Sequence, residues 1–86
     1  MANLIDYKNI IGEWINQHQD TAEIEEAINY NSACISFHKT SNSPFISISI
    51  TTNDYVYKFQ YNYISYPKYD MSKLDHLSTI NINNVD

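Results

Sequence analysis

Alternation of apolar and polar side chains between residues 33 and 63 is the feature that most constrains how this chain can fold. Side chains that repeat every second position line one face of a β-strand. The β-branched and aromatic content of these segments favours strands as well. We therefore predict three half-buried strands, whose inward side chains are Ala33, Ile35 and Phe37, then Ile46, Ile48 and Ile50, then Tyr55, Tyr57, Phe59, Tyr61 and Tyr63.

A two-residue turn at Asn53–Asp54 would set the register of the last two strands. It pairs Thr52 with Tyr55, and then Ile50 with Tyr57, Ile48 with Phe59 and Ile46 with Tyr61. The loop from Lys39 to Pro44 similarly allows Phe37 to face Ile46 and Ile35 to face Ile48. One sheet face is then apolar, and the other carries Cys34, Ser36, His38, Phe45, Ser47, Ser49, Lys58, Gln60 and Asn62.

The segments before and after this region have helical spacing. Residues 3–18 place Leu4, Tyr7, Ile11, Trp14, Ile15 and His18 on one helical face, with Asn3 as the N-cap. Gly12 lies inside this helix, which implies a neighbour that packs closely against it. A second helix is predicted over residues 20–29, where Asp20 and Glu23 have capping-box spacing and Ile24, Ala27 and Ile28 form a stripe. One continuous helix over residues 3–29 is the alternative.

A short C-terminal helix is predicted after Pro67, capped by Asp70 and carrying Met71, Leu74 and Leu77 on one side. Residues 79–86 are interpreted either as a frayed tail or, through Ile80 and Ile82, as a brief fourth strand. The 86 residues fit a single domain, residues 1–86. The expected fold is α+β: two N-terminal helices packed on one face of a three-stranded antiparallel sheet, then the short helix, in the order α-α-β-β-β-α.

Several kinds of chemistry are excluded by composition. Gly12 is the single glycine and Cys34 the single cysteine, so glycine-rich phosphate loops, internal disulfides and cysteine metal sites are ruled out. The histidines at positions 18, 38 and 76 lack metal-ligand spacing, and no catalytic signature is present. We therefore expect a protein that is not an enzyme and has no cofactor or metal.

Location and partner class follow from charge and hydropathy. The N-terminus has no cationic start followed by an apolar run, and no apolar stretch approaches the ~20 residues of a membrane helix, so we expect a cytoplasmic protein that does not bind membranes. The net charge is −5 and arginine is absent. Direct nucleic-acid binding is therefore disfavoured, and we expect the tyrosine run over residues 55–63 to be core instead of a base-stacking platform.

The acidic residues are concentrated near the N-terminus. Residues 1–31 contain six acids and one lysine, whereas residues 32–86 contain four of each, and all four glutamates lie between positions 13 and 26. A focused negative patch accelerates capture of a basic partner. The hypothesis that follows is a protein that neutralises a basic protein, most concretely an immunity protein against a nuclease-type toxin. The candidate contacts are Asp20, Glu23, Glu25 and Glu26, with Tyr30, Tyr66 and Tyr69 as flanking aromatic anchors.

Two other function classes stay open. A phage or mobile-element inhibitor of a host defence system, of the anti-CRISPR or nucleic-acid-mimic type, would suit the same composition. A self-associating structural module, a homodimer for example, could form through an edge strand and the serine-rich sheet face. The gene neighbourhood would separate the first two, and light scattering on the purified protein would test the third.

Overall fold

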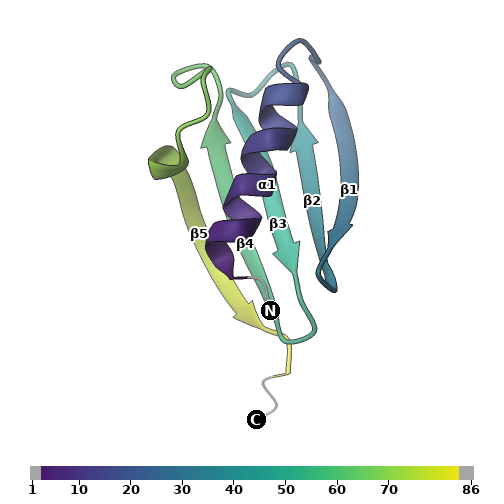
Figure 1. Ribbon diagram of the computed structural model, residues 1–86. Helices are drawn as coiled ribbons and strands as arrows, with labels where there is room; N and C mark the ends of the chain where they lie inside the picture. Colours follow the sequence, from purple (N-terminus) through teal and green to yellow (C-terminus); the bar gives the residue numbers. More distant parts are fainter. Residues whose placement is uncertain (1–2, 84–86) are drawn as a thin grey trace.

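Within residues 3–83, which the computed structural model describes, the chain forms one α-helix and one five-stranded antiparallel sheet (Figure 1). The strands cross the sheet in chain order, so that each pairs with strands next to it in sequence. The expected architecture, with two helices on three strands, is therefore wrong. The elements are α1 (Leu4–Gln17), β1 (Ile24–Tyr30), β2 (Ala33–Lys39), β3 (Phe45–Thr51), β4 (Tyr55–Asn62), the 3₁₀ turn η1 (Met71–Lys73) and β5 (Leu74–Asn81).

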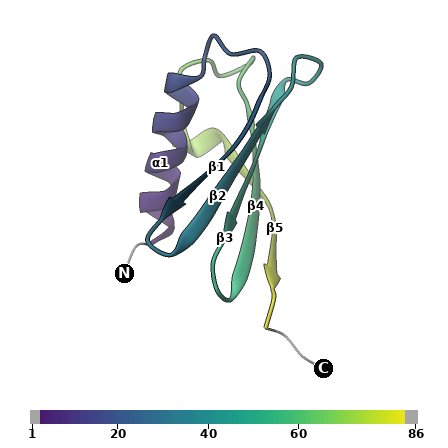
Figure 2. The same cartoon turned by 90° about the vertical axis from the view of Figure 1, so that its right-hand side faces the viewer.

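The helix α1 covers one face of the sheet and leaves the other face open (Figure 2). The side chain of Asn3 accepts a hydrogen bond from the Asp6 N–H at 3.1 Å, and the Asp6 carboxylate accepts one from the Asn3 N–H at 3.2 Å. This capping box begins the helix. The helical period predicted the inward face correctly, since its buried side chains include Tyr7, Ile11, Trp14 and Ile15. They join the inward residues of the sheet in one core, where Trp14 stacks on Phe37 with ring centroids 4.1 Å apart.

The predicted second helix over residues 20–29 is wrong, because residues 24–30 form β1. The segment fits two periods: Ile24, Ala27 and Ile28 have helical spacing, whereas Ile24, Ile28 and Tyr30 also alternate as in a strand. The turn at Asn31–Ser32, where both residues have left-handed backbone, folds β1 directly onto β2. This antiparallel pairing supplies hydrogen-bond partners for the backbone groups of β2 that face β1. A helix over residues 20–29 could not supply them, because its own backbone groups would be bonded within the helix.

The register of the central hairpin is confirmed, and that of the preceding pair is shifted. Ile46, Ile48 and Ile50 face Tyr61, Phe59 and Tyr57, as the turn at Asn53–Asp54 predicted. Phe37, however, faces Ile48 instead of Ile46, and Ile35 faces Ile50 instead of Ile48. The shift is two residues, because β2 continues to Lys39, which pairs with Ile46. An even shift keeps every side chain on its predicted face, so alternation alone could not reveal it.

The predicted C-terminal helix over residues 70–77 is also wrong. Asp70 caps only the single turn η1, accepting a hydrogen bond from the Ser72 N–H at 3.0 Å, and the chain then continues as β5. The pairing of β5 with β4 has an irregularity at Leu77, since Lys58 faces Ser78 and its neighbour Phe59 faces His76. Of the region 79–86, residues 79–81 end β5, and residues 84–86 lie outside the described residues.

Two tyrosines attach the loop between β4 and η1 to the rest of the molecule. The buried Tyr61 hydroxyl lies 2.7 Å from the carbonyl oxygen of Tyr66 and accepts a hydrogen bond from the Asp70 N–H at 3.0 Å. The Tyr69 hydroxyl donates to the carbonyl oxygen of Lys8 in α1 at 2.8 Å, and its ring lies on Gly12. Tyr69 is therefore the close neighbour that the glycine implied. None of the described helices has the length and apolar character needed to cross a membrane.

Candidate functional site: an acidic sheet edge

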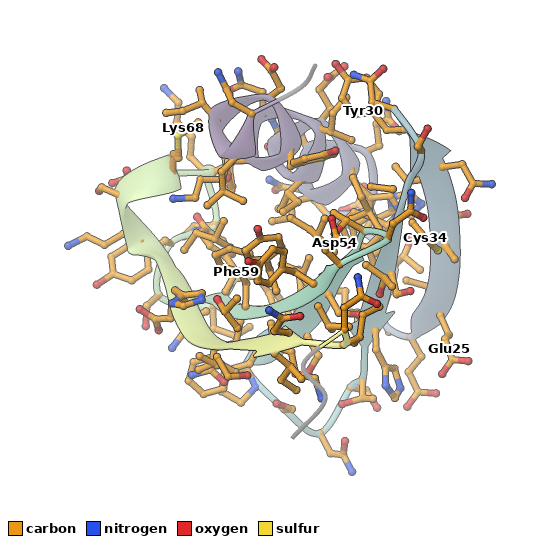
Figure 3. The ribbon with its side chains drawn as sticks, turned by 90° about the horizontal axis from the view of Figure 1, so that it is seen from below. Glu25, Tyr30, Cys34, Asp54, Phe59 and Lys68 are labelled. Carbon is orange, nitrogen blue, oxygen red and sulfur yellow. The ribbon has the colours of Figure 1, made fainter. Side chains whose placement is uncertain are left out.

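The four acidic residues singled out from the sequence lie along one edge of the sheet. Asp20 is in the connection between α1 and β1, Glu23 directly precedes β1, and Glu25 and Glu26 belong to β1 itself. β1 pairs with β2 on one side only, so its other side is a free edge in the described sheet. We call these four residues the acidic edge. Figure 3 shows Glu25 on the outer side of β1, pointing away from the helix.

Three carboxylates of the acidic edge, those of Glu23, Glu25 and Glu26, contact neutral groups or a histidine. Glu23 accepts a hydrogen bond from the Ser41 hydroxyl at 3.0 Å, and Glu26 accepts one from the Trp14 indole N–H at 2.6 Å. Glu25 lies 4.0 Å from Nδ1 of His38, which is the one contact within 4.0 Å between an acidic side chain and a lysine or histidine among residues 3–83. The acidic edge therefore has no lysine counter-ion within that distance in the described structure.

Three of the five lysines lie away from the acidic edge. Lys8 approaches the ring of Phe59 and Lys73 that of Tyr66, both contacts being on the β4–β5 side of the sheet. Lys68 lies beside the 3₁₀ turn, on the opposite side of the molecule from Glu25 (Figure 3). These three lysines thus lie away from the acidic edge, whereas Lys58 lines the open-face groove together with Glu25 and Glu26, and Lys39 is within reach of the charge of Asp20.

The three candidate tyrosines do not gather around the acidic edge. Tyr30 is at the far end of β1 from Glu25 and packs edge-on against Tyr7, with ring centroids 5.7 Å apart. Tyr66 is 38% exposed in the loop after β4. Tyr69 is half-buried against α1, and this burial raises the pKa of its hydroxyl to about 12. The four acids therefore share the β1 side of the sheet, with Glu25 and Glu26 on opposite faces, whereas the tyrosines lie at three separate places.

The open face of the sheet carries a groove of about 520 Å³. Glu25, His38 and Ser47 face one another on adjacent strands there, in the order of an acid–histidine–serine relay. The contacts of a relay are missing in the described residues: Glu25 and His38 are 4.0 Å apart, and no hydrogen bond joins His38 to Ser47. The neighbouring backbone N–H groups lie within paired strands, where an oxyanion would have to compete for them. Among the described residues, this row therefore lacks the hydrogen bonds that join the members of an activated nucleophile.

Lys39 is a feature that the sequence reasoning missed. The inward period of β2 places its side chain under the end of α1, where it is 3% exposed. Its ammonium donates to the carbonyl oxygen of His18 at 2.8 Å and lies 4.5 Å from the ring centre of Tyr63. Burial lowers the pKa of Lys39, while the charge of Asp20 opposes that effect. The signal was present in the sequence, because Lys39 continues the inward series Ala33, Ile35 and Phe37.

Among residues 3–83, no group of three or more histidine, cysteine, aspartate or glutamate side chains is placed so that it could hold a metal ion. Comparisons with known protein families, with curated proteins and with solved structures find no match to this chain. Two features of the described structure are unusual in charge: the acidic edge and the buried Lys39.

Proposed function

We propose that this protein is a non-enzymatic binding protein that neutralises a basic protein partner, and that it serves as an immunity protein against a nuclease-type toxin. The acidic edge is the proposed contact surface. The observation that carries the proposal is the placement of four carboxylates within residues 20–26, at a free sheet edge and without a lysine within 4.0 Å in the described structure. Uncompensated like charges at one edge have an unfavourable mutual energy, which a cationic partner would relieve.

Two properties of β1 suit it to such a partner. A free strand edge presents unpaired backbone N–H and C=O groups, which an incoming strand or loop can bind. Glu25 and Glu26 are consecutive in β1, so their side chains leave the strand toward opposite sheet faces. Lysine or arginine side chains of a partner could therefore form pairs on both faces of the edge. Long-range attraction from the acidic edge would also raise the association rate.

The proposed contact set is narrower than the sequence suggested. Asp20, Glu23 and Glu25 form its centre. Glu26 also has an internal role, because it accepts the hydrogen bond of the Trp14 indole. Tyr30, Tyr66 and Tyr69 are not included, because each is held at a different place by contacts within the protein.

The test uses two variants with equal changes in net charge. Glu23→Gln with Glu25→Gln neutralises the acidic edge, and Glu13→Gln with Asp75→Asn removes the same charge from exposed positions on α1 and β5. The partner to assay is the purified protein encoded immediately upstream of this chain's gene. We expect the edge variant to bind it at least tenfold more weakly, about 1.4 kcal/mol, and to lose protection of co-expressing cells. The control variant should keep both.

Equal binding of the edge variant and the control variant would contradict the proposed surface. Failure of the upstream product to bind at all, together with binding to a nucleic-acid-binding defence protein, would favour the defence-inhibitor alternative. Raising the salt concentration should weaken the complex with the parent protein more than the complex with the edge variant, because screening acts on exposed charges.

A further inference from the structure

A cavity of about 270 Å³ lies at the end of α1, away from the open groove. It is enclosed by the last turn of α1, the facing ends of β2 and β3, and the loop that follows β4. Apolar side chains dominate its wall, and two polar side chains, Gln19 and Lys39, are the exceptions. The lining residues are Ile15, Gln19, Lys39, Ile46, Tyr63, Ile64 and Pro67.

Lys39 is the one charged side chain that is buried in the described structure. All of its contacts are neutral: the carbonyl oxygens of His18 and Gln19, at 2.8 and 3.5 Å, and the face of the Tyr63 ring. No carboxylate of residues 3–83 lies within 4.0 Å of its ammonium. Buried charges in proteins are normally paired, because removal from water is costly without a counter-ion.

The carbonyl groups at the end of α1 compensate only part of this charge. The terminus of a helix carries a partial negative charge, equivalent to about half an elementary charge. Asp20 lies in the following connection, near enough to act on Lys39 through its field but beyond 4.0 Å. The ammonium has three N–H donors, of which two are directed at these carbonyl oxygens, so one donor remains without an oxygen acceptor among the described contacts. An anionic group could accept from it if the rest of the molecule suits the apolar wall of the cavity.

We propose that this cavity binds a small aliphatic carboxylate, with its carboxylate group at the Lys39 ammonium and its chain against Ile15, Ile46 and Ile64. The volume of about 270 Å³ is just below the usual range for ligand pockets, roughly 300–1,000 Å³, so the occupant is a short acid. An amine would be repelled by Lys39, and an alcohol would supply no charge. The site shares no residue with the acidic edge, so the proposal does not depend on the proposed function.

The test is a titration of the ¹⁵N-labelled protein at neutral pH with hexanoate, hexanol and hexylamine in parallel, followed by amide chemical shifts. We expect hexanoate to cause saturable shifts centred on the lining residues, with a Kd of about 1 mM, as ligand efficiency allows for a molecule of this size. Hexanol and hexylamine should bind at least tenfold more weakly. Absence of saturation by about 20 mM hexanoate, shifts centred elsewhere, or equal binding of hexanol would overturn the proposal.

A substitution at the exposed rim of the cavity can test the site without removing a buried contact that the fold needs. Lys39→Met should abolish hexanoate binding, but it also removes a helix contact. Ile64 is 64% exposed, so Ile64→Glu should fold normally while placing a carboxylate at the mouth of the cavity. We expect it to weaken hexanoate binding at least tenfold. The matched control, Ile5→Glu, changes a 55% exposed isoleucine near the other end of α1 and should leave binding unchanged. Unimpaired binding by the Ile64→Glu protein would refute the site.

Discussion

The ring of Tyr69 lies on Gly12 so closely that a Cβ atom added to Gly12 would be 2.5 Å from two of its ring carbons. Glycine inside a helix costs up to ~1 kcal/mol relative to alanine, so Gly12→Ala would stabilise an isolated helix. Here we expect the opposite, a loss of about 1–3 kcal/mol in the free energy of unfolding, because the Tyr69 ring must move. Urea unfolding measures the change.

A second substitution separates this contact from other effects. In a Tyr69→Leu background, Gly12→Ala should cost less than it does in the parent protein, or should stabilise. The interaction energy between the two positions comes from the four urea curves of a double-mutant cycle. Independent, additive effects at positions 12 and 69 would show that the contact is not the reason for the glycine.

The turn between β1 and β2 offers a stabilising substitution. Asn31 and Ser32 have φ angles of 48° and 65°, a conformation that suits asparagine at the first position and glycine at the second. We expect Ser32→Gly to increase the free energy of unfolding by about 0.5–1 kcal/mol, since glycine adopts this conformation without a steric penalty. Ser65→Gly, at a serine without positive φ, is the control and should not stabilise. A lower thermal midpoint for the Ser32→Gly protein would contradict the prediction.

Alkaline pH should destabilise the protein through its buried tyrosines. Burial raises the pKa of Tyr69 to about 12 and also raises that of Tyr61, so both hydroxyls keep their protons more tightly in the folded state. The stabilisation is complete below the unfolded pKa of about 10 and is lost as pH rises through the folded values. Unfolding free energies measured between pH 8 and 11.5 should fall.

Tyr69→Phe isolates one of the two groups. This variant should lose about 1 kcal/mol at neutral pH, because the hydrogen bond to the Lys8 carbonyl is removed. Its stability should then decline less steeply above pH 10 than that of the parent. The lowered pKa of Lys39 makes the free energy of unfolding rise with pH, opposite to the effect of the tyrosines. Because Lys39 is present in both proteins, its contribution cancels when the two pH profiles are compared. Parallel pH profiles would argue against a Tyr69 contribution.

The contact between Trp14 and Glu26 should contribute to stability. The indole N–H donates to the Glu26 carboxylate at 2.6 Å, and this bond connects α1 to the edge strand. We expect Glu26→Ala to cost about 1 kcal/mol, as is usual for one hydrogen bond. Glu26→Gln keeps an oxygen acceptor and should cost less. In a Trp14→Phe background, which lacks the indole N–H, Glu26→Ala should reduce the free energy of unfolding by less than it does in the parent protein. An equal reduction in both backgrounds would show that this hydrogen bond is not the source of the effect.

The central hairpin could be predicted from sequence because local and global signals agree there. The apolar period, the turn residues Asn53–Asp54 and the pairing of large side chains all give the same register. The register of β2 with β3 was missed because Lys39 was assigned to the loop. A lysine at an inward position is rare, and only the approach of the end of α1 makes its burial feasible.

The errors at β1 and β5 have separate physical causes. In β1, the glutamates have weak strand preference and the isoleucines fit both periods, so pairing with β2 decides the conformation. In β5, the irregularity at Leu77 interrupts the alternation. Met71, Leu74 and Leu77 also have helical spacing in the sequence, although they lie in a turn and a strand. For the candidate site, charge counting identified the acids, but the tyrosines could not be placed without the tertiary contacts.

The chain-order succession of the five strands has a consequence for how the molecule assembles. β2, β3 and β4 can each close onto the preceding strand through a short hairpin, which is entropically inexpensive and fast, whereas β5 follows the longer connection over residues 63–73. The apolar stripe of α1 has nothing to dock on until this sheet exists, because its buried side chains share one core with the inward residues of β2, β3 and β4. The helix precedes the strands in the chain, but the surface on which it docks is complete only after residues as far along as Tyr61 have joined the sheet.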